Sequence, residues 1–458
     1  MTVAALAAAI RRGELTPRDA VQDALDRIER DDPAFNSFLT VRGEEALAEA
    51  DALGASGGPL HGVPVGVKDV IDVAGTRTTA ASKVLADNVA TADATVVARL
   101  RAAGAVIVGK LNTHEFAWGA STTSQAFGPA RNPWDTGRIC GGSSGGSGAA
   151  VAGGLVPGAL GTDTAGSVRI PAALCGVTGI RPSTGRVPNR GVIPVSWTYD
   201  TVGPLAHTAE DCALLLDAIG GSEPGDASAT TVPAEPCVPA LEGGVAGLRI
   251  GVVAHLFEDV PLDPRVGTAV EAAVAELGRL GARVERVEAP FLRRAEVAQQ
   301  LVMLPEAAEA HLPWLRTRLA DYGADVRARL LAGLLLPASA PITGQRARRA
   351  LAAEARPLFD RFDLLAAPEM PIVAPRIGED PVDVGGEELP YRLSLIPFNS
   401  PWSCLGLPTV SVPCGLVDGL PVGLALTGRR LAEATVLRAA HAFQRATDWH
   451  ERRPPPPA

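Results

Sequence analysis

Residues 141–148 have the strongest chemical character in the sequence, and they read Gly-Gly-Ser-Ser-Gly-Gly-Ser-Gly. Glycine inside a regular element costs about 1 kcal/mol relative to alanine, so this density of glycine indicates unusual dihedral angles and close backbone approach. A phosphate-binding loop is excluded, because no Gly-Lys-Ser/Thr ends the stretch. A flexible linker explains neither the apolar residues on both sides nor the motif that follows.

The second motif, Gly-Thr-Asp-Thr-Ala-Gly-Ser over residues 161–167, is a turn of small residues that ends in serine. Successive backbone N–H groups from Thr164 to Ser167 can converge on one point. That convergence is what an oxyanion hole requires.

A third segment places Lys68 at the end of a short apolar, strand-like run over residues 61–67. An ammonium group there is poorly solvated, which lowers its pKa from ~10.4 towards neutrality. The sequence contains only three lysines, and arginine supplies every other positive charge. Arginine cannot lose its proton in a protein, whereas lysine can. Lys68 is therefore a candidate base, whereas Lys83 and Lys110 are predicted to be solvated normally.

Together these motifs resemble the amidase signature family. The resemblance rests on GGSSGGSGAAVAGG, GTDTAGSVRIPAALCGVTGIRP and GVPVGVKD, with KLNTHEFAWG, FDLLAAPEMP and LPTVSVPCGLVDGLPVGLALTG extending it nearly end to end. It implies a catalytic triad in which Ser167 is the nucleophile, Ser143 relays the proton and neutral Lys68 is the general base. It also implies a cis peptide bond between Gly142 and Ser143.

Further roles follow from the same resemblance. The backbone N–H groups of Thr164, Ala165 and Gly166 would form the oxyanion hole. Most members carry glycine where this chain has Ala165, and alanine is compatible with the hole only if its φ is negative.

Residues beside the triad receive less specific predictions. Ser144 and Asp163 either support the triad or only satisfy a turn. Gly142 would contact the substrate. Arg169 would bind an acidic substrate or, as the favoured alternative, form a structural salt bridge.

Helices and strands must bring these motifs together. Thr16, Pro17 and Asp19 indicate a capped helix start. Helical patterns over 93–104 and from 264 to 281 each lead to a strand, near 105–108 and 284, and 248–254 is a further strand. This alternation predicts an α/β/α sandwich around a mixed central sheet, the fold of the amidase signature family.

We expect residues 1–458 to form a single amidase domain. Its catalytic core covers about 50–220 and 364–450, and a Gly/Pro/Ser/Ala-rich linker covers about 220–247. An inserted α/β and helical layer occupies about 248–363 and is expected to contribute to substrate specificity.

Composition excludes several functions. The net charge of −9 and the aromatic content of 4% argue against direct binding of nucleic acid or of an anionic membrane. Six cysteines lie without CxxC pairing and are expected to be reduced and packed. Dispersed histidines make a metal site improbable, and the mechanism needs no cofactor. The N-terminus does not resemble a secretory signal, so a cytoplasmic location is expected.

The predicted function is hydrolysis of a carboxamide in a small molecule through an acyl-enzyme. One alternative within the family is the glutaminase A subunit of a tRNA-dependent amidotransferase, which needs a partner subunit. A second alternative is cleavage of an ester or of a carbamate or urea-type amide by the same triad. A third, of another class, is a catalytically silent binding protein on the same scaffold. An α/β-hydrolase with Ser143 in a G-x-S-x-G elbow would need a preceding strand, an acid and a histidine such as His441. A homodimer is left open.

Overall fold

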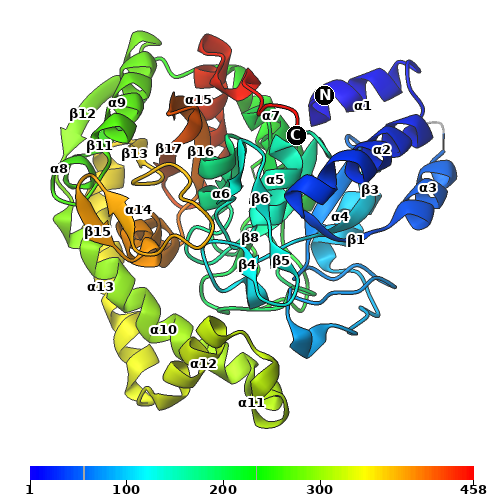
Figure 1. The fold of residues 1–458 in the computed structure, drawn as a ribbon. Coiled ribbons are helices and arrows are strands. Elements are labelled where there is room, and N and C mark those ends of the chain that lie inside the picture. Colours follow the sequence, from blue (N-terminus) through cyan, green and yellow to red (C-terminus); the bar gives the residue numbers. More distant parts are fainter. Residues whose placement is uncertain (55–56, 234, 458) are drawn as a thin grey trace.

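The computed structural model describes residues 1–54, 57–233 and 235–457, and a central sheet of eleven strands organises them (Figure 1). The strands lie in the order β1 (Phe38–Val41), β3 (Val106–Leu111), β2 (Pro64–Lys68), β8 (Gly158–Asp163), β10 (Thr201–Ala206), β9 (Thr178–Arg181), β16 (Thr409–Val417), β17 (Leu420–Gly428), β13 (Leu364–Pro368), β11 (Arg249–Val253) and β12 (Arg283–Val287). Parallel pairs (β3–β2–β8 and β13–β11–β12) lie on either side of antiparallel strands. The predicted mixed sheet is confirmed.

Helices cover both faces of this sheet and bury two hydrophobic clusters. One face carries α4 (Thr95–Ala102), α7 (Ala209–Ile219), α9 (Pro264–Arg279) and α15 (Glu433–Ala446). The other carries α2 (Pro17–Phe35), α3 (Gly43–Ala52), α5 (Gly145–Ala152) and α6 (Arg169–Cys175). The central strands β2, β8, β10, β16 and β17 are buried along nearly their whole length because both faces of the sheet are covered there, whereas the edge strand β12 is mostly exposed.

Additional helices extend away from the sheet, at the lower left of Figure 1. They are α10 (Ala295–Ala310), α11 (Leu312–Thr317), α12 (Ala324–Leu335) and α13 (Ser339–Arg361). We call these four the helical layer, and α14 (Tyr391–Leu405) packs against α10 and α13 beside it. The remaining elements are α1 (Val3–Arg11), α8 (His255–Glu258) and the small hairpins β4–β5 (Thr123–Ser124, Gly128–Pro129), β6–β7 (Arg131–Asn132, Asp135–Ile139) and β14–β15 (Val382–Val384, Glu387–Leu389).

Several local predictions are confirmed. Thr16 and Asp19 form a reciprocal capping box at the start of α2, with Pro17 at its first position. The strand and helix patterns correspond to β3, β11, α9 and β12. No helix of the described residues is long and apolar enough to cross a membrane.

The predicted inserted layer shares the sheet with the predicted core, because β11 and β12 continue it beside β13. The proposed domain boundaries stay a prediction. Residues 220–247, with position 234 outside the described part, contain few regular elements, but Cys237 and Leu241 are buried against the core. This segment therefore packs on the molecule along part of its length.

The prediction for Lys110 is wrong. Its side chain is fully buried, and Nζ donates to Asp69 Oδ1 at 2.9 Å and to Thr78 Oγ1 at 2.8 Å. A lysine at the end of a buried strand can remain charged when a carboxylate is beside it, which the linear pattern did not reveal. Lys83 is exposed, as predicted.

Candidate active site

Lys68 is the last residue of β2, and its side chain is fully buried. Nζ lies 2.7 Å from Ser143 Oγ, 2.7 Å from Thr162 Oγ1 and 3.5 Å from the Thr162 carbonyl oxygen. Burial lowers the pKa of Lys68 to about 7, although the charges of Asp163 and Asp200 act in the opposite direction. A substantial fraction of Lys68 is therefore neutral at neutral pH and able to accept a proton.

The glycine-rich stretch brings Ser143 to this lysine. The Gly142–Ser143 peptide bond is cis, as the family resemblance implied. The chain then enters α5 at Gly145, and a Cβ on Gly146 would lie 2.5 Å from the backbone N and O of Asn112. Glycine is needed there because the backbone of residue 112 passes against the helix start.

Ser144 fixes the stretch to its surroundings. Its hydroxyl donates to the Thr162 carbonyl at 3.1 Å and accepts from the Thr162 N–H, and its own N–H donates to the Ser167 carbonyl at 3.1 Å. Ser144 thus links the Ser143 segment to both β8 and Ser167, which agrees with a supporting role.

Ser167 lies on the turn between β8 and α6 and lines a cavity that opens to solvent. Its side chain is partly exposed, whereas Lys68 and Ser143 are fully buried behind it. Gly142, Thr164 and Ala165 line the same cavity. The structure therefore gathers the predicted site residues around one opening, with Gly142 where a substrate would contact it.

The three predicted oxyanion donors are not equivalent. The Gly166 N–H donates to Asp163 Oδ1 at 2.8 Å, so it is already engaged within the turn, and its role in the oxyanion hole stays a prediction. Gly166 instead supplies a backbone turn with φ of +119°, where a Cβ would lie 2.4 Å from Asn399 Oδ1. Ala165 is not among the described residues with positive φ, so alanine causes no backbone strain there.

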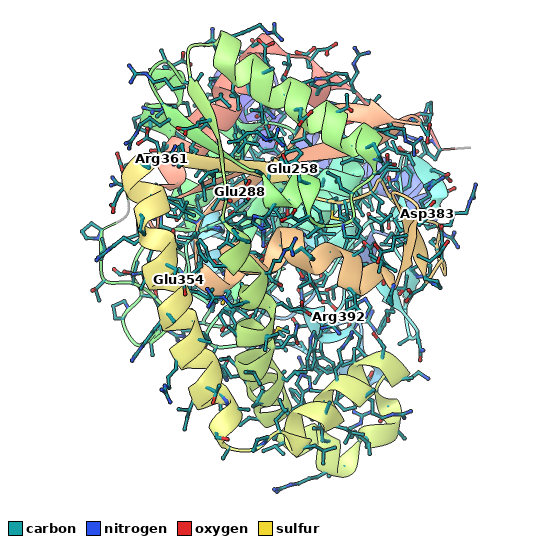
Figure 2. The ribbon with its side chains drawn as sticks, turned by 90° about the vertical axis from the view of Figure 1, so that its left-hand side faces the viewer. Glu258, Glu288, Glu354, Arg361, Asp383 and Arg392 are labelled. Carbon is teal, nitrogen blue, oxygen red and sulfur yellow. The ribbon has the colours of Figure 1, made fainter. Side chains whose placement is uncertain are left out.

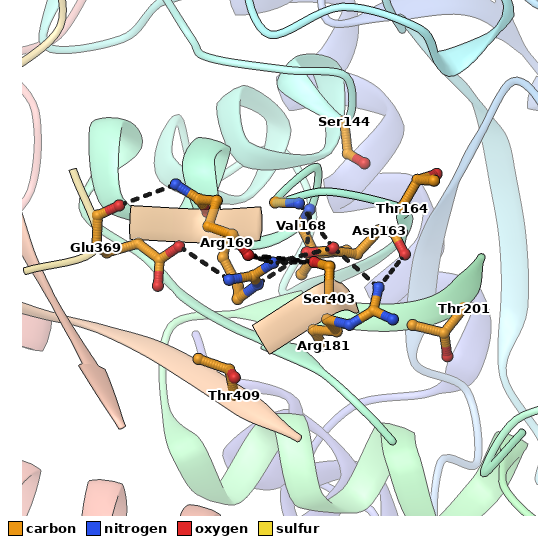
Figure 3. A network of polar contacts seen from close by, with 12 residues as sticks. Ser144, Asp163, Thr164, Val168, Arg169, Arg181, Thr201, Glu369, Ser403 and Thr409 are labelled. Atoms are coloured by element: carbon orange, nitrogen blue, oxygen red, sulfur yellow. Dashed lines mark hydrogen bonds and ion pairs between the residues drawn. The ribbon is translucent and has the colours of Figure 1, made fainter. Parts of the chain in front are cut away.

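Asp163 is the centre of a buried polar network behind Ser167 (Figure 3). It receives hydrogen bonds from the Arg169 Nε at 3.0 Å, from Arg181 at 3.1 Å and from the N–H groups of Gly166 and Val168. Burial alone would raise the pKa of Asp163, but the two guanidinium groups hold it below its ordinary value. The network fixes the turn that carries Ser167.

Arg169 is a structural ion-pair residue in this arrangement. Its side chain is fully buried, pairs with Asp163, donates to Ser403 Oγ at 2.7 Å and does not line the cavity. The substrate-binding prediction for Arg169 is therefore corrected in favour of the salt-bridge alternative. The side chain points back into the core because Asp163 and Glu369 lie there.

Sequence reasoning missed several members of this network. Thr162 holds Lys68, and Glu369 lies 3.5 Å from Arg169, with burial raising the pKa of Glu369 to about 8. Asp200 accepts from Thr164 Oγ1 at 2.6 Å, and burial raises its pKa to about 6. Glu369 lies in the quoted segment FDLLAAPEMP, but no linear signal connects it to Arg169, 200 positions earlier.

The segment around Glu115 has partners that the sequence did not reveal. Glu115 accepts from Ser82 Oγ at 2.6 Å and from the Gly323 N–H at 2.8 Å, and His114 Nε2 lies 2.9 Å from Asp325 Oδ2. These contacts attach the segment to the helical layer. They position Trp118, which lines the cavity.

The nucleophile-elbow alternative is not supported. Ser143 contacts Lys68, while His441 lies on α15 beside Glu242, 3.6 Å away. Cys140 and Cys175, which flank the two motifs, are buried and free. No cluster of potential metal ligands occurs among the described residues.

Comparisons with known proteins agree with this geometry. The sequence profile of the family described as Amidase matches residues 19–437. The chain is 41% identical to the A subunit of the glutamyl-tRNA(Gln) amidotransferase of Roseiflexus sp. (strain RS-1), over 97% of this chain and 96% of the relative. It is 40% identical to the protein of the same name from Moorella thermoacetica, over 99% and 98%.

Solved structures show the same fold. One belongs to work on a vestigial protein complex that reveals the evolutionary origins of an s-triazine catabolic enzyme, with a TM-score of 0.93, 40% identity and coverage of 97% and 98%. The A subunit of the Thermotoga maritima glutamyl-tRNA(Gln) amidotransferase gives a TM-score of 0.82 at 34% identity, over 96% of this chain and 94% of that one. A bacterial aryl acylamidase gives 0.91 at 28%, over 98% of each.

Proposed function

We propose, from the premise that this chain belongs to the amidase family, that it cleaves a carboxamide through an acyl-enzyme on Ser167. The observation that carries the proposal is the contact of 2.7 Å between Lys68 Nζ and Ser143 Oγ, with a Lys68 pKa of about 7, directly behind the cavity that Ser167 lines. A serine hydroxyl is a weak nucleophile until a neighbouring base accepts its proton.

The proton path runs through two hydroxyl groups. Neutral Lys68 takes the proton of Ser143 while Ser143 takes that of Ser167, and Ser167 Oγ forms a bond to the amide carbon. The negative charge then develops on the amide oxygen. The N–H groups of Thr164 and Ala165, at the cavity wall, are the donors that would stabilise it.

Collapse of the tetrahedral intermediate breaks the C–N bond. The proton held by Lys68 returns through Ser143 to the leaving nitrogen, which departs as ammonia or an amine. Water then attacks the ester on Ser167 along the same path, giving the carboxylic acid and the free serine. The sequence of steps balances without a metal or an organic cofactor.

The comparisons favour the amidotransferase alternative over a free-standing amidase. Both curated relatives described above carry the name of the A subunit of the glutamyl-tRNA(Gln) amidotransferase, and the match extends over nearly their whole length. In that alternative the nitrogen leaves as ammonia, and a partner subunit uses it. The chain is then one part of a complex.

A second candidate is a free-standing hydrolase of a small amide. The likeness to the bacterial aryl acylamidase and to 6-aminohexanoate cyclic dimer hydrolase, with a TM-score of 0.91 in both cases, supports it. The two candidates share the chemistry at Ser167 and differ in the amide and in the need for a partner.

Labelling with a fluorophosphonate probe tests the shared chemistry. We expect one adduct on Ser167, found by peptide mapping, which is absent in Ser167→Ala and slower to form in Lys68→Ala and Ser143→Ala. An adduct on Ser143, or no adduct on the folded protein, contradicts the proposal.

Ammonia release from glutamine by the purified chain distinguishes the two candidates. Turnover that appears only when a partner subunit is added supports the amidotransferase alternative. Rapid turnover of a small amide by the chain alone supports the free-standing hydrolase. Ser167→Ala is the matched control for contaminating activity in both cases.

A further inference from the structure

Much of the lining of the cavity at Ser167 is apolar. Helices α10 and α14 supply Met303, Leu395 and Ile396, and Trp118 and Ile170 complete this lining. An apolar lining disfavours any polar group of a substrate that finds no hydrogen-bond or ion-pair partner in the cavity, because burying such a group unpaired is costly.

A single charged residue interrupts this lining. Arg392 lies in the first turn of α14 and is the only charged side chain among the described residues that line the cavity. The lining contains no Asp or Glu among those residues. Figure 2 labels Arg392 at the side of α14 that faces α11 and α12.

The Arg392 guanidinium has no protein counter-ion in contact with it. It is half-buried, and burial lowers its pKa, yet no ion pair or hydrogen bond joins it to any residue in the described ranges. A guanidinium carries five donors in a planar fork, and no Arg392 nitrogen is among the fully buried, unpartnered atoms of the described residues, so these donors are accessible to a ligand in the cavity.

Neighbouring charges do not neutralise it. Asp325 is already taken by His114 at 2.9 Å and by Arg329 at 2.9 Å, and Arg329 and Arg392 repel one another. Glu296 feels the charge of Arg392 but lines a different hollow, together with Arg293. Among the described residues, the lining of the cavity therefore carries one positive charge, that of Arg392, and no negative one, in the same space that Ser167 lines.

From this juxtaposition we infer that Arg392 binds a carboxylate of the substrate, which is a small amide carrying a negative charge and no ammonium group. The inference rests on the proposed amide hydrolysis at Ser167. An Arg–carboxylate pair is planar and bidentate, so it would fix the distance and orientation of the amide relative to Ser167.

An amino acid amide such as glutamine fits this cavity less well. It carries an ammonium group next to its carboxylate, and that group would enter a space with a guanidinium and no carboxylate. Desolvation without a partner, added to repulsion by Arg392, disfavours it. The inference thus separates the amide donor of this chain from free glutamine, and it favours the free-standing hydrolase over the amidotransferase alternative that the relatives' names suggest.

Three compounds isolate these features. Glutaramate is glutamine without its amino group, and pentanamide is glutaramate with the carboxylate replaced by a methyl group. Protection of Ser167 against the fluorophosphonate probe reports binding of each compound even where turnover is slow, and ammonia release reports turnover. We expect glutaramate to protect at concentrations at least about tenfold lower than glutamine or pentanamide, the difference that one buried charge contact makes.

Variants assign the preference to the residue. The preference is the protecting concentration of pentanamide divided by that of glutaramate, and in Arg392→Gln it should fall towards about one. The control is Arg346→Gln, which changes an arginine on α13 away from the cavity lining and should keep the wild-type preference. Arg392→Lys should retain part of the preference because it keeps the charge but loses the fork. Labelling of Ser167 in each variant verifies that the site is folded.

The outcomes are distinguishable. Equal protection by glutaramate and pentanamide in the wild type, or glutamine binding as well as glutaramate, overturns the inference. A glutaramate preference that survives in Arg392→Gln also overturns it. Failure of the proposed function has a different signature, namely the absence of any adduct on Ser167.

Discussion

Two sides of one cavity meet at Ser167, and they are constructed differently. The strand side comprises β2, β8, the stretch 141–144 and the turn 163–167. Apart from Ser167, its polar side chains are buried, and Lys68, Ser143 and Asp163, which are fully buried, are each held by hydrogen bonds. The helical side comprises α10 and α14, with α12 packed on α10 behind them, and Gln300, Arg392 and Ile396 line its part of the cavity with partial exposure.

This difference suggests that the strand side carries out the reaction and the helical side selects the substrate. Preorganised donors and acceptors are effective only when they are held in place before the substrate arrives, which requires the buried network of the strand side. The helical side can change a side chain without disturbing that network, so it can adapt one catalytic arrangement to different amides. The predictions below test whether the two sides are as independent as this comparison suggests.

The largest effect is expected for Ser167→Ala. Removing the nucleophile should lower kcat for any amide substrate by about 10⁴-fold or more, because acyl-enzyme formation is lost. Stability should change by less than about 0.5 kcal/mol, since this side chain is partly exposed at the cavity rather than part of the buried network. Amide hydrolysis assays and urea unfolding measure the two effects.

A residual rate in Ser167→Ala within about tenfold of the wild type would move the nucleophile elsewhere. A loss of several kcal/mol would instead show that Ser167 belongs to the structural network of the strand side.

Asp163→Asn should have the largest effect on folding. It leaves Arg169 and Arg181 buried without their shared counter-ion, and breaking a buried pair by removing one partner costs about 3–5 kcal/mol. The control on the helical side is Asp325→Asn, whose side chain is 51% exposed and should cost no more than about 1 kcal/mol. Similar losses of unfolding free energy in both variants, measured by urea denaturation, would break the comparison.

Much of the strand side could be predicted from sequence. Lys68, Ser143 and Ser167 lie in compact motifs whose residue types are rare outside such chemistry, and the alternation of helices and strands indicated the sheet. The helical side could not be predicted. Arg392 becomes distinctive only when the fold places it in the same cavity as Ser167, 225 positions away in the chain, because a single arginine has no local signature.

The buried network was also only partly predictable. Asp163 and Arg169 are close in sequence, but Arg181, Glu369 and Ser403 come from three separate segments. Burial of a charge is a property of the assembled structure. For the same reason Lys110, which lies near the end of a strand much as Lys68 does, was not recognised as part of an ion pair.

The pH dependence of kcat/KM tests the base on the strand side. With a Lys68 pKa of about 7, the neutral form dominates above that pH and becomes scarce below it. Activity should therefore rise with pH, about tenfold per unit below about pH 6, and level off above about pH 8. Lys68 acts as a base only in its neutral form, so the activity of the enzyme is lost as the pH falls below the pKa of Lys68.

The profile should be the same for charged and neutral amides if Lys68 governs it. An activity that falls between about pH 6 and 8, or a plateau reached only near about pH 10, would show that Lys68 does not titrate as a base near neutrality. Either result would remove it as the base.

The smallest effect is expected for Ala165→Gly. The family resemblance implies glycine at this position in most members, and the φ of Ala165 is not positive, so the methyl group imposes no backbone strain. Its contribution to catalysis is a backbone N–H, which glycine also supplies, and kcat should stay within about threefold of the wild type.

Gly166→Ala is the sharper counterpart, because φ is +119° there and the new Cβ would lie 2.4 Å from Asn399 Oδ1 on α14. We expect it to lower kcat by at least about tenfold, as the turn shifts away from Ser143. If Ala165→Gly proved the more harmful of the two, the methyl group of Ala165 would have to act as a wall of the cavity, and the strand side would take part in selecting the substrate.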